Sequence, residues 1–287
     1  MTTPGPALRR RQLAQTLQDL REQAGMKVEG VAERLDLSRS AIAAYEAGRN
    51  VVSQPVLEAL LRLYGAYDEK FDVLNELRKE AKKPGWWSTY RLPHWLTSYV
   101  GLEADAASAR VFSLELLPGL VQTEDYARQL HSMVQVQLSD DAVERRVTAR
   151  LQRQKRLVGP PPNPLTFSAV ISEGALRRLP AEPAMAVAQL RHLESSARLP
   201  NVSLRVLPFA AGLHRSMSGS FTLLSFASGV SLDIAYQEYA VGGHLVDEQD
   251  VVHELAGVYD QLHSQALDED ASLAAISELM ELMERRT

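Results

Sequence analysis

The chain contains no cysteine among its 287 residues, which excludes disulfide bonds and metal sites built from thiolates. It also lacks a run of about 18 apolar residues, so no membrane-spanning helix is expected. The N-terminus lacks the apolar core of a signal peptide. Its 7 histidines show no metal-ligand spacing, and the Gly-x-Ser-x-Gly and phosphate-loop patterns of common enzymes are missing. We therefore expect a cytoplasmic protein that is no enzyme and has no metal or cofactor.

The net charge is small, at −5, but it is unevenly distributed along the chain. Residues 1–83 carry 14 basic and 12 acidic side chains, whereas the remaining residues carry 17 basic and 24 acidic ones. A mildly basic surface on one small domain is enough to meet DNA phosphates, so the acidic total does not exclude a nucleic-acid partner. Arg9, Arg10 and Arg11, at the start of the first expected helix, are compatible with phosphate contacts and equally with a solvated helix start.

Residues 25–50 show the pattern of two short helices joined by a tight turn. Ser38 is placed to cap the second helix, because its hydroxyl can accept a hydrogen bond from an otherwise unpaired backbone N–H. A helix that is capped in this way and is polar in its first turn has a shape suited to the major groove. An ordinary helical hairpin fits the pattern equally well. The apolar side of the two helices is formed by Val31, Ala32, Leu35, Leu37, Ile42 and Tyr45.

This segment resembles the Xre/Cro-type helix-turn-helix of bacterial regulators. The residues that carry the resemblance are Gly25, Val31-Ala32, Leu37-Ser38, Ile42 and the run Glu46-Ala47-Gly48-Arg49. It implies a helical DNA-binding unit from about Ala7 to about Tyr64. Two departures reduce the polar contacts that the family would make: Val28 replaces a usual glutamine, and Ala43-Ala44 replace a common Ser-Arg pair.

Helical register predicts which side of the second helix meets DNA. Arg39 and Ala43 share one face. Ser40 and Ala44 lie beside them. Arg39 is the candidate for two hydrogen bonds to guanine, and Ala43 and Ala44 are candidates for contact with thymine methyl groups. Glu46 is expected to be structural, pairing with Arg34 or capping backbone groups. The residues predicted to hold phosphates are Lys27, Ser38, Ser40 and Arg49.

Three regions are expected along the chain. Residues 1–83 form the helix-turn-helix domain, which includes a further helix at about residues 68–82 and ends at a Lys-Lys-Pro-Gly stop. Residues 84–106 form an aromatic linker or docking segment that contains Trp86 and Trp87. These two side chains could bind a ligand or partner, although aromatic residues in such a segment more often dock a linker onto the next domain.

Residues 107–287 are expected to form an α+β regulatory or partner-binding domain, because short β-type runs alternate with helical ones. The strand candidates are residues 111–116, 165–171, 202–207, 220–226 and 232–237. The helix candidates are residues 123–134, 139–158, 183–197, 248–265 and 269–284. The proline-rich run at residues 160–164 breaks the chain before a strand. The fold class is therefore an all-α helix-turn-helix domain followed by an α+β domain.

Residues 84–280 resemble the uncharacterised C-terminal domain of actinobacterial WhiJ-type regulators. The resemblance is carried by Pro84 to Trp87, Leu117 to Arg128, Arg150 to Gln154, Leu176 to Arg178, Pro200 to Val202 and Val206 to Gly212. It implies a developmental or metabolic regulator that works with a small protein encoded by a neighbouring gene.

Three features of the C-terminal region leave alternatives open. The loop before the helix at residue 123 could line a ligand pocket with Gln122 as its polar anchor, or could be a structural turn. The arginine-rich helix at residues 139–158 could bind an acidic partner or DNA, although a solvated helix paired with neighbouring acids is favoured. The final helix has an apolar stripe that either docks on its own domain or forms a dimer seam.

The predicted function is a sequence-specific DNA-binding transcriptional regulator. Its partners are double-stranded DNA, a second copy of the chain and a small partner protein, with no membrane association. Its C-terminal domain would mediate dimerisation and the response to a partner or effector. The alternative is an antitoxin-like interaction module that binds DNA weakly on its own and is controlled by the small partner protein.

Overall fold

The computed structural model describes residues 4–134, 138–159, 164–227 and 232–285. These residues form two compact units, one ending at Ser88 and the other beginning at Thr89. Among them, no helix is long and apolar enough to cross a membrane. The N-terminal unit is helical and the C-terminal unit combines helices with a sheet, which confirms the expected fold class.

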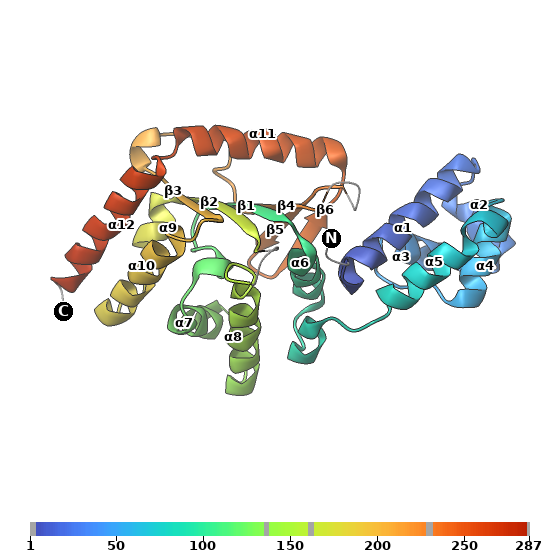
Figure 1. Cartoon of the computed structure of the whole chain (residues 1–287), viewed down its shortest axis with the longest axis horizontal. Helices are drawn as coiled ribbons and strands as arrows, with labels where there is room; N and C mark the ends of the chain where they lie inside the picture. The colour runs from blue at the N-terminus through green and yellow to red at the C-terminus, as the bar shows by residue number, and fades with distance from the viewer. Residues whose placement is uncertain (1–3, 135–137, 160–163, 228–231, 286–287) are drawn as a thin grey trace. The chain divides into compact units, whose positions relative to one another are not determined.

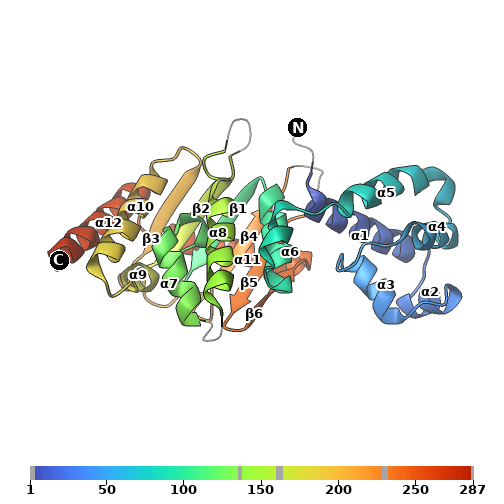
Figure 2. The same cartoon turned by 90° about the horizontal axis from the view of Figure 1, so that it is seen from below.

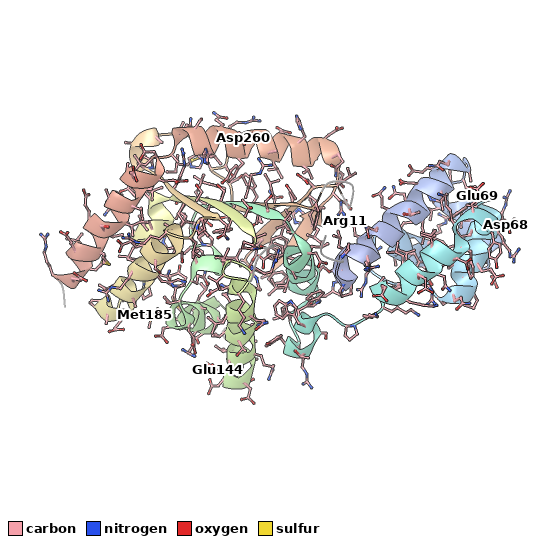
Figure 3. The ribbon with its side chains drawn as sticks, viewed as in Figure 1. Arg11, Asp68, Glu69, Glu144, Met185 and Asp260 are labelled. Carbon is pink, nitrogen blue, oxygen red and sulfur yellow. The ribbon has the colours of Figure 1, made fainter. Side chains whose placement is uncertain are left out.

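The described residues of the N-terminal unit form five α-helices, which are blue to cyan in Figure 1. They are α1 (Pro6–Gln23), α2 (Val28–Arg34), α3 (Arg39–Glu46), α4 (Gln54–Leu63) and α5 (Tyr67–Ala81). α5 is the further helix that was expected at about residues 68–82, and it lies beyond the end at Tyr64 that the family resemblance implied. Asp68 and Glu69 lie in the first turn of α5 (Figure 3), where their negative charge meets the positive end of the helix dipole.

One apolar core holds these helices together. Leu13, Leu17 and Leu20 form the buried stripe of α1, as their spacing predicts. They pack with buried side chains of the other helices, including Ile42 of α3 and Leu57 of α4. Each buried leucine or isoleucine contributes roughly 1.5–3 kcal/mol of transfer free energy. The core thus fixes the position of α3, whose outer side stays available.

The C-terminal unit contains a mixed sheet of six strands. The strands are β1 (Ser108–Ser113), β2 (Thr166–Ser172), β3 (Val202–Leu207), β4 (Phe221–Ser225), β5 (Ile234–Tyr239) and β6 (Gly242–Val246). Their order across the sheet is β3-β2-β1-β4-β5-β6. The first three strands run parallel to one another, and β4, β5 and β6 follow as antiparallel neighbours.

Helices cover both faces of this sheet (Figures 1 and 2). The helices of this unit are α6 (His94–Asp105), α7 (Glu124–Val134), α8 (Asp140–Gln154), α9 (Glu173–Arg177), α10 (Pro183–Ala197), α11 (Gln249–Gln265) and α12 (Glu269–Glu284). The long α11 lies on one face and α6, α7, α8 and α10 lie on the other. Phe112 and Val170 of the sheet are completely buried in the core that also includes Leu262 of α11. On the α11 side, Arg110 of β1 pairs with Asp260 (Figure 3) at 3.3 Å.

Most expected elements of this unit are confirmed, and two α-helices and one strand were missed. The structure has β3, α10 and α12 with the predicted bounds, whereas β1 begins and ends three residues before the predicted strand. The short α9, the edge strand β6 and the helix α6 were not expected. Since α6 lies within the segment assigned as an aromatic linker, much of that segment is regular structure. Residues 160–163, in the predicted chain break, lie outside the described residues.

The final helix docks on its own unit. Ile276 and Leu279 of α12 are buried, and the helix packs against α10 and β3. Ser272 is also completely buried, and its hydroxyl oxygen accepts a hydrogen bond of 2.9 Å from the backbone N–H of Val206 in the edge strand β3. Of the two alternatives for the apolar stripe, intramolecular docking therefore accounts for its central residues.

Candidate nucleic-acid interface

The turn between α2 and α3 is built by backbone geometry and one side-chain cap. Asp36 has a φ of 52°, a left-handed conformation that aspartate tolerates better than most residues. The backbone N–H of Leu37 then donates to the carbonyl of Ala32 at 2.9 Å, which closes the end of α2. Ser38 accepts a hydrogen bond of 3.1 Å from the backbone N–H of Ala41. The predicted cap of α3 is confirmed.

The C-terminal end of α3 turns back on itself at a glycine. Gly48 has a φ of 64°, which an L side chain adopts only with strain. This turn lets the backbone N–H groups of Arg49 and Asn50 both donate to the carbonyl of Ala44, at 2.9 and 3.2 Å. The geometry leaves the side chain of Arg49 exposed just beyond the helix.

A bidentate ion pair between Arg21 and Glu46 holds α3 against α1. Nε of Arg21 donates to one carboxylate oxygen of Glu46 at 2.7 Å, and Nη2 donates to the other at 3.0 Å. The two side chains are only 11% and 10% exposed. Arg21 also donates through Nη1 to the carbonyl of Met26 at 2.8 Å. Glu46 is therefore structural, as expected, but its partner is Arg21 of α1 and not Arg34 of α2.

The outward face of α3 carries Arg39, Ala43 and Ala47. They are spaced by four residues, which places them along one side of the helix. The side chain of Arg39 is 72% exposed, Ala43 is half-buried and Ala47 is exposed. Ala44 differs from the expectation, because it is only 9% exposed and belongs to the inward side of α3. Ala44 therefore does not lie on the exposed side of α3, whereas Ala47, which was not expected there, does.

An acidic side chain of α2 lies near this face. A carboxylate oxygen of Glu29 is 3.6 Å from Nη1 of Arg39, and both side chains are mostly exposed. Such a pair is weak in water. It nevertheless keeps a negative charge close to the arginine that is expected to read a base. Glu29 was not among the residues expected in this site.

The residues expected to hold phosphates flank the outward face of α3. Lys27 is the exposed residue just before α2, and Arg49 is an exposed residue three positions after the end of α3. Ser40 is exposed in the first turn of α3, where its hydroxyl lies 3.0 Å from the hydroxyl of Ser38. Ser40 thus lies within α3 and Arg49 beyond its end, whereas Lys27 precedes α2.

The arginines at the start of α1 are largely used within the N-terminal unit. Arg9 donates to the carbonyl of Pro4 at 2.8 Å, and Arg10 donates to the carbonyl of Ala81 at 3.3 Å. Burial lowers the pKa of Arg10. Arg11 follows on the same helix (Figure 3). Because Arg9 and Arg10 are tied to backbone carbonyls, neither of the two is the freely solvated helix start considered above.

The three residues proposed to touch a ligand or partner have structural contacts. Trp87 is 8% exposed and meets the ring of Trp86 edge-on, with ring centroids 5.9 Å apart. Gln122 is 2% exposed, and its side-chain amide donates to the carbonyl of Leu117 at 2.7 Å. Its side-chain oxygen accepts a hydrogen bond from Arg150 of α8. Gln122 is therefore not positioned to meet a ligand directly, because the protein already occupies both ends of its amide.

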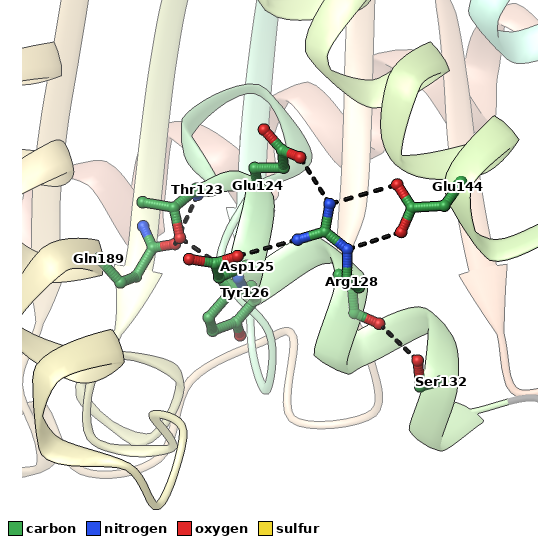
Figure 4. A network of polar contacts seen from close by, with 8 residues as sticks. All are labelled: Thr123, Glu124, Asp125, Tyr126, Arg128, Ser132, Glu144 and Gln189. Atoms are coloured by element: carbon green, nitrogen blue, oxygen red, sulfur yellow. Dashed lines mark hydrogen bonds and ion pairs between the residues drawn. The ribbon is translucent and has the colours of Figure 1, made fainter. Parts of the chain in front are cut away.

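The arginine-rich α8 is only partly the solvated helix that was expected. Figure 4 shows its outer contact, in which Arg128 of α7 lies between Glu124 and Asp125 of its own helix and Glu144 of α8. Arg153 of α8 lies on the inward side. It is 8% exposed and binds both carboxylate oxygens of the buried Glu103 at 2.7 Å. Burial alone would lower the pKa of Arg153, but the charge of Glu103 outweighs it and raises that pKa.

Two known domain families match this chain. The five-helix unit, with a capped second helix whose outer face is exposed, defines a helix-turn-helix protein, and a family model described as a helix-turn-helix domain matches residues 12–74. A second family model, described as a domain of unknown function (DUF5753), matches residues 96–278. The chain belongs to this DUF5753 family. No curated protein and no solved structure matches it.

The described residues offer no metal site. No group of three or more histidine, aspartate or glutamate side chains that could hold a metal ion occurs in the part of the chain that the structure describes. The helix-turn-helix domain is typical of DNA-binding regulators.

Proposed function

We propose that the chain is a sequence-specific transcriptional regulator that places α3 in the major groove of DNA. The observation that carries this proposal is the exposed face of Arg39, Ala43 and Ala47 on a helix fastened from behind by Arg21 and Glu46. An exposed arginine in the first turn of a recognition helix can bind both acceptors of a guanine. The methyl groups of the two alanines supply apolar contacts to thymine but no hydrogen bonds.

Base reading then depends mainly on Arg39, and positioning depends on the flanking polar residues. Lys27, Ser40 and Arg49 are proposed to contact phosphates, which fixes the register of the protein without reading sequence. The match of the helix-turn-helix family to this region supports the proposal. With few polar groups on α3, we expect modest specificity from a single copy.

We further propose that two copies bind two half-sites and that the C-terminal unit mediates dimerisation and the response to an effector or partner. Dimeric binding to paired half-sites is usual for helix-turn-helix proteins. The resemblance of the C-terminal sequence to WhiJ-type regulators supports a regulatory role and a small partner protein.

Salt-dependent DNA binding by the purified full chain tests the proposal. Arg49→Ala is expected to weaken binding to all sequences alike and to reduce the salt slope by about one. Arg39→Ala is expected to cost roughly 1–3 kcal/mol of discrimination between a guanine and other bases. Arg198→Ala, which removes an exposed charge at the end of α10, is the matched control and should change neither quantity. Binding that is insensitive to both substitutions in the N-terminal unit contradicts the proposal.

A further inference from the structure

One arginine on the inner side of α8 is held in place but is not neutralised. Arg150 donates one hydrogen bond, from Nη1, to the side-chain oxygen of Gln122. A guanidinium has five N–H donors. Among the described residues, the other four donors of Arg150 have no hydrogen-bond partner. None of its nitrogens is both completely buried and without a hydrogen bond. Nε and Nη2 therefore keep some accessible surface, and the residue as a whole is half-buried.

Gln122 fixes the direction of this arginine. The glutamine is almost completely buried, and its other end donates to the carbonyl of Leu117. Its own backbone carbonyl accepts a hydrogen bond of 2.7 Å from Gln154 of α8. A buried side chain held at both ends is a rigid support. Arg150 therefore loses little conformational freedom when its remaining donors bind something.

The surroundings of Arg150 are positively charged. Arg153 is one turn away, but both oxygens of its carboxylate partner, Glu103, are already bound to it. No ion pair joins Arg150 to a carboxylate within the described parts of the chain. Glu238 of β5 attracts Arg150 electrostatically but is exposed, and its carboxylate accepts a hydrogen bond from Tyr236. The arginine thus lacks a direct counter-ion.

A histidine of α7 adds an unused polar atom to this cluster. Nε2 of His131 is buried and has no hydrogen-bond partner. Burial, followed by the charges of Arg150 and Arg146, lowers the pKa of His131 to about 3, so the ring is neutral at pH 7. Burial and the charge of Arg153 lower the pKa of Arg150 to about 10. Both shifts arise mainly from burial, and neighbouring positive charges add to them.

We propose that Arg150 binds the carboxylate or phosphate group of a small anionic effector at the inner side of α8. Two parallel N–H donors of a guanidinium match a carboxylate or phosphate edge. A half-buried arginine favours a small anion over a DNA backbone, because phosphates of a duplex are met by fully exposed side chains. This site gives the proposed effector response a location, and to that extent the inference rests on the proposed function.

Binding measurements without DNA test the site independently of DNA recognition. The full chain is titrated with inorganic phosphate, with succinate and with a non-specific duplex, each at matched ionic strength, by calorimetry and thermal unfolding. The expected result is saturable binding of phosphate or succinate with one site per chain and a raised unfolding temperature. Arg150→Gln is expected to weaken that binding by about tenfold or more, because a charge-assisted pair of hydrogen bonds is lost.

Two further variants make the test specific. Arg150→Lys retains the charge but not the paired N–H donors of the guanidinium. This variant should therefore bind the anion several-fold more weakly than the unsubstituted chain and more tightly than Arg150→Gln. Arg145→Gln removes the same charge five positions earlier, on another face of α8, and should bind as the unsubstituted chain does. If Arg150→Gln does not fold, the comparison of Arg150→Lys with Arg145→Gln decides.

The proposal is overturned if neither anion binds saturably, if Arg150→Gln or Arg150→Lys binds as tightly as the unsubstituted chain, or if only the duplex binds through Arg150. If the unsubstituted chain binds the anions but binds no DNA sequence specifically, that result counts against the proposed function alone.

Discussion

Glu46→Gln is the substitution that tests how α3 is held. The carboxylate binds Arg21 through two oxygens at 2.7 and 3.0 Å, and both side chains are about nine-tenths buried. Glutamine keeps the shape but loses the charge, and its amide NH2 group faces a guanidinium donor. Arg21 then retains the carbonyl of Met26 and the largely exposed Glu22. Hydrogen bonds to charged groups contribute roughly 1.5–3 kcal/mol each, so we expect a loss of about 2 kcal/mol in the free energy of unfolding.

Urea denaturation followed by circular dichroism measures this loss, and hydrogen exchange of α3 peptides locates it. Glu58→Gln is the matched control, because Glu58 forms an exposed i,i+4 pair with Arg62 on α4. That pair contributes about 0.3–0.5 kcal/mol. If Glu46→Gln destabilised the protein no more than Glu58→Gln, or left exchange in α3 unchanged, the ion pair would not be what fastens the recognition helix.

Three more predictions follow from single residues. Glu29→Gln should tighten DNA binding by about 1.5-fold to fivefold in a fluorescence anisotropy titration, because it releases Arg39 from an ion pair of about 0.2–1 kcal/mol. Unchanged or weaker binding would contradict this expectation. Gly48→Ala should destabilise the protein by about 1–2 kcal/mol in urea, because its φ is left-handed, whereas Gly30→Ala, within α2 and with open space around its Cβ, should be neutral or stabilising. The pKa of His131 in the folded protein lies below its unfolded value, so the contribution of the neutral ring to stability is complete above about pH 6.5. That contribution is lost as the pH falls toward 3, by up to about 1.4 kcal/mol per pH unit. His131→Phe should remove this part of the acid sensitivity, and a pH profile of stability that is unchanged in this variant would contradict the prediction.

The sequence predicted the N-terminal helices well, because their signals are local. The cap at Ser38 and the stripe of Leu13, Leu17 and Leu20 lie within one helix or next to it. The buried position of Ala44 was missed, because register relative to Arg39 does not say which flank of α3 packs on the core. The partner of Glu46 was also missed, because it lies 25 residues away on another helix.

In the C-terminal unit, the sequence predicted elements but not the contacts that give them a role. The edge strand β6 was missed because it begins with Gly242 and Gly243, which weaken the strand pattern. The helix α6 was missed because its aromatic residues were interpreted as a linker; Tyr99 instead stacks on Tyr236, with ring centroids 4.1 Å apart. The support that Gln122 gives to Arg150 joins residues 28 positions apart, so no local pattern reports it.

Selection of binding sites from a random duplex pool tests the central claim, that the outward face of α3 reads DNA, most directly. The unsubstituted chain should enrich a motif that contains a guanine. Arg39→Ala should lose preference at that position only, and Arg49→Ala should enrich the same motif with lower overall affinity. An identical motif for the unsubstituted chain and Arg39→Ala, or no enriched motif at all, would contradict the account.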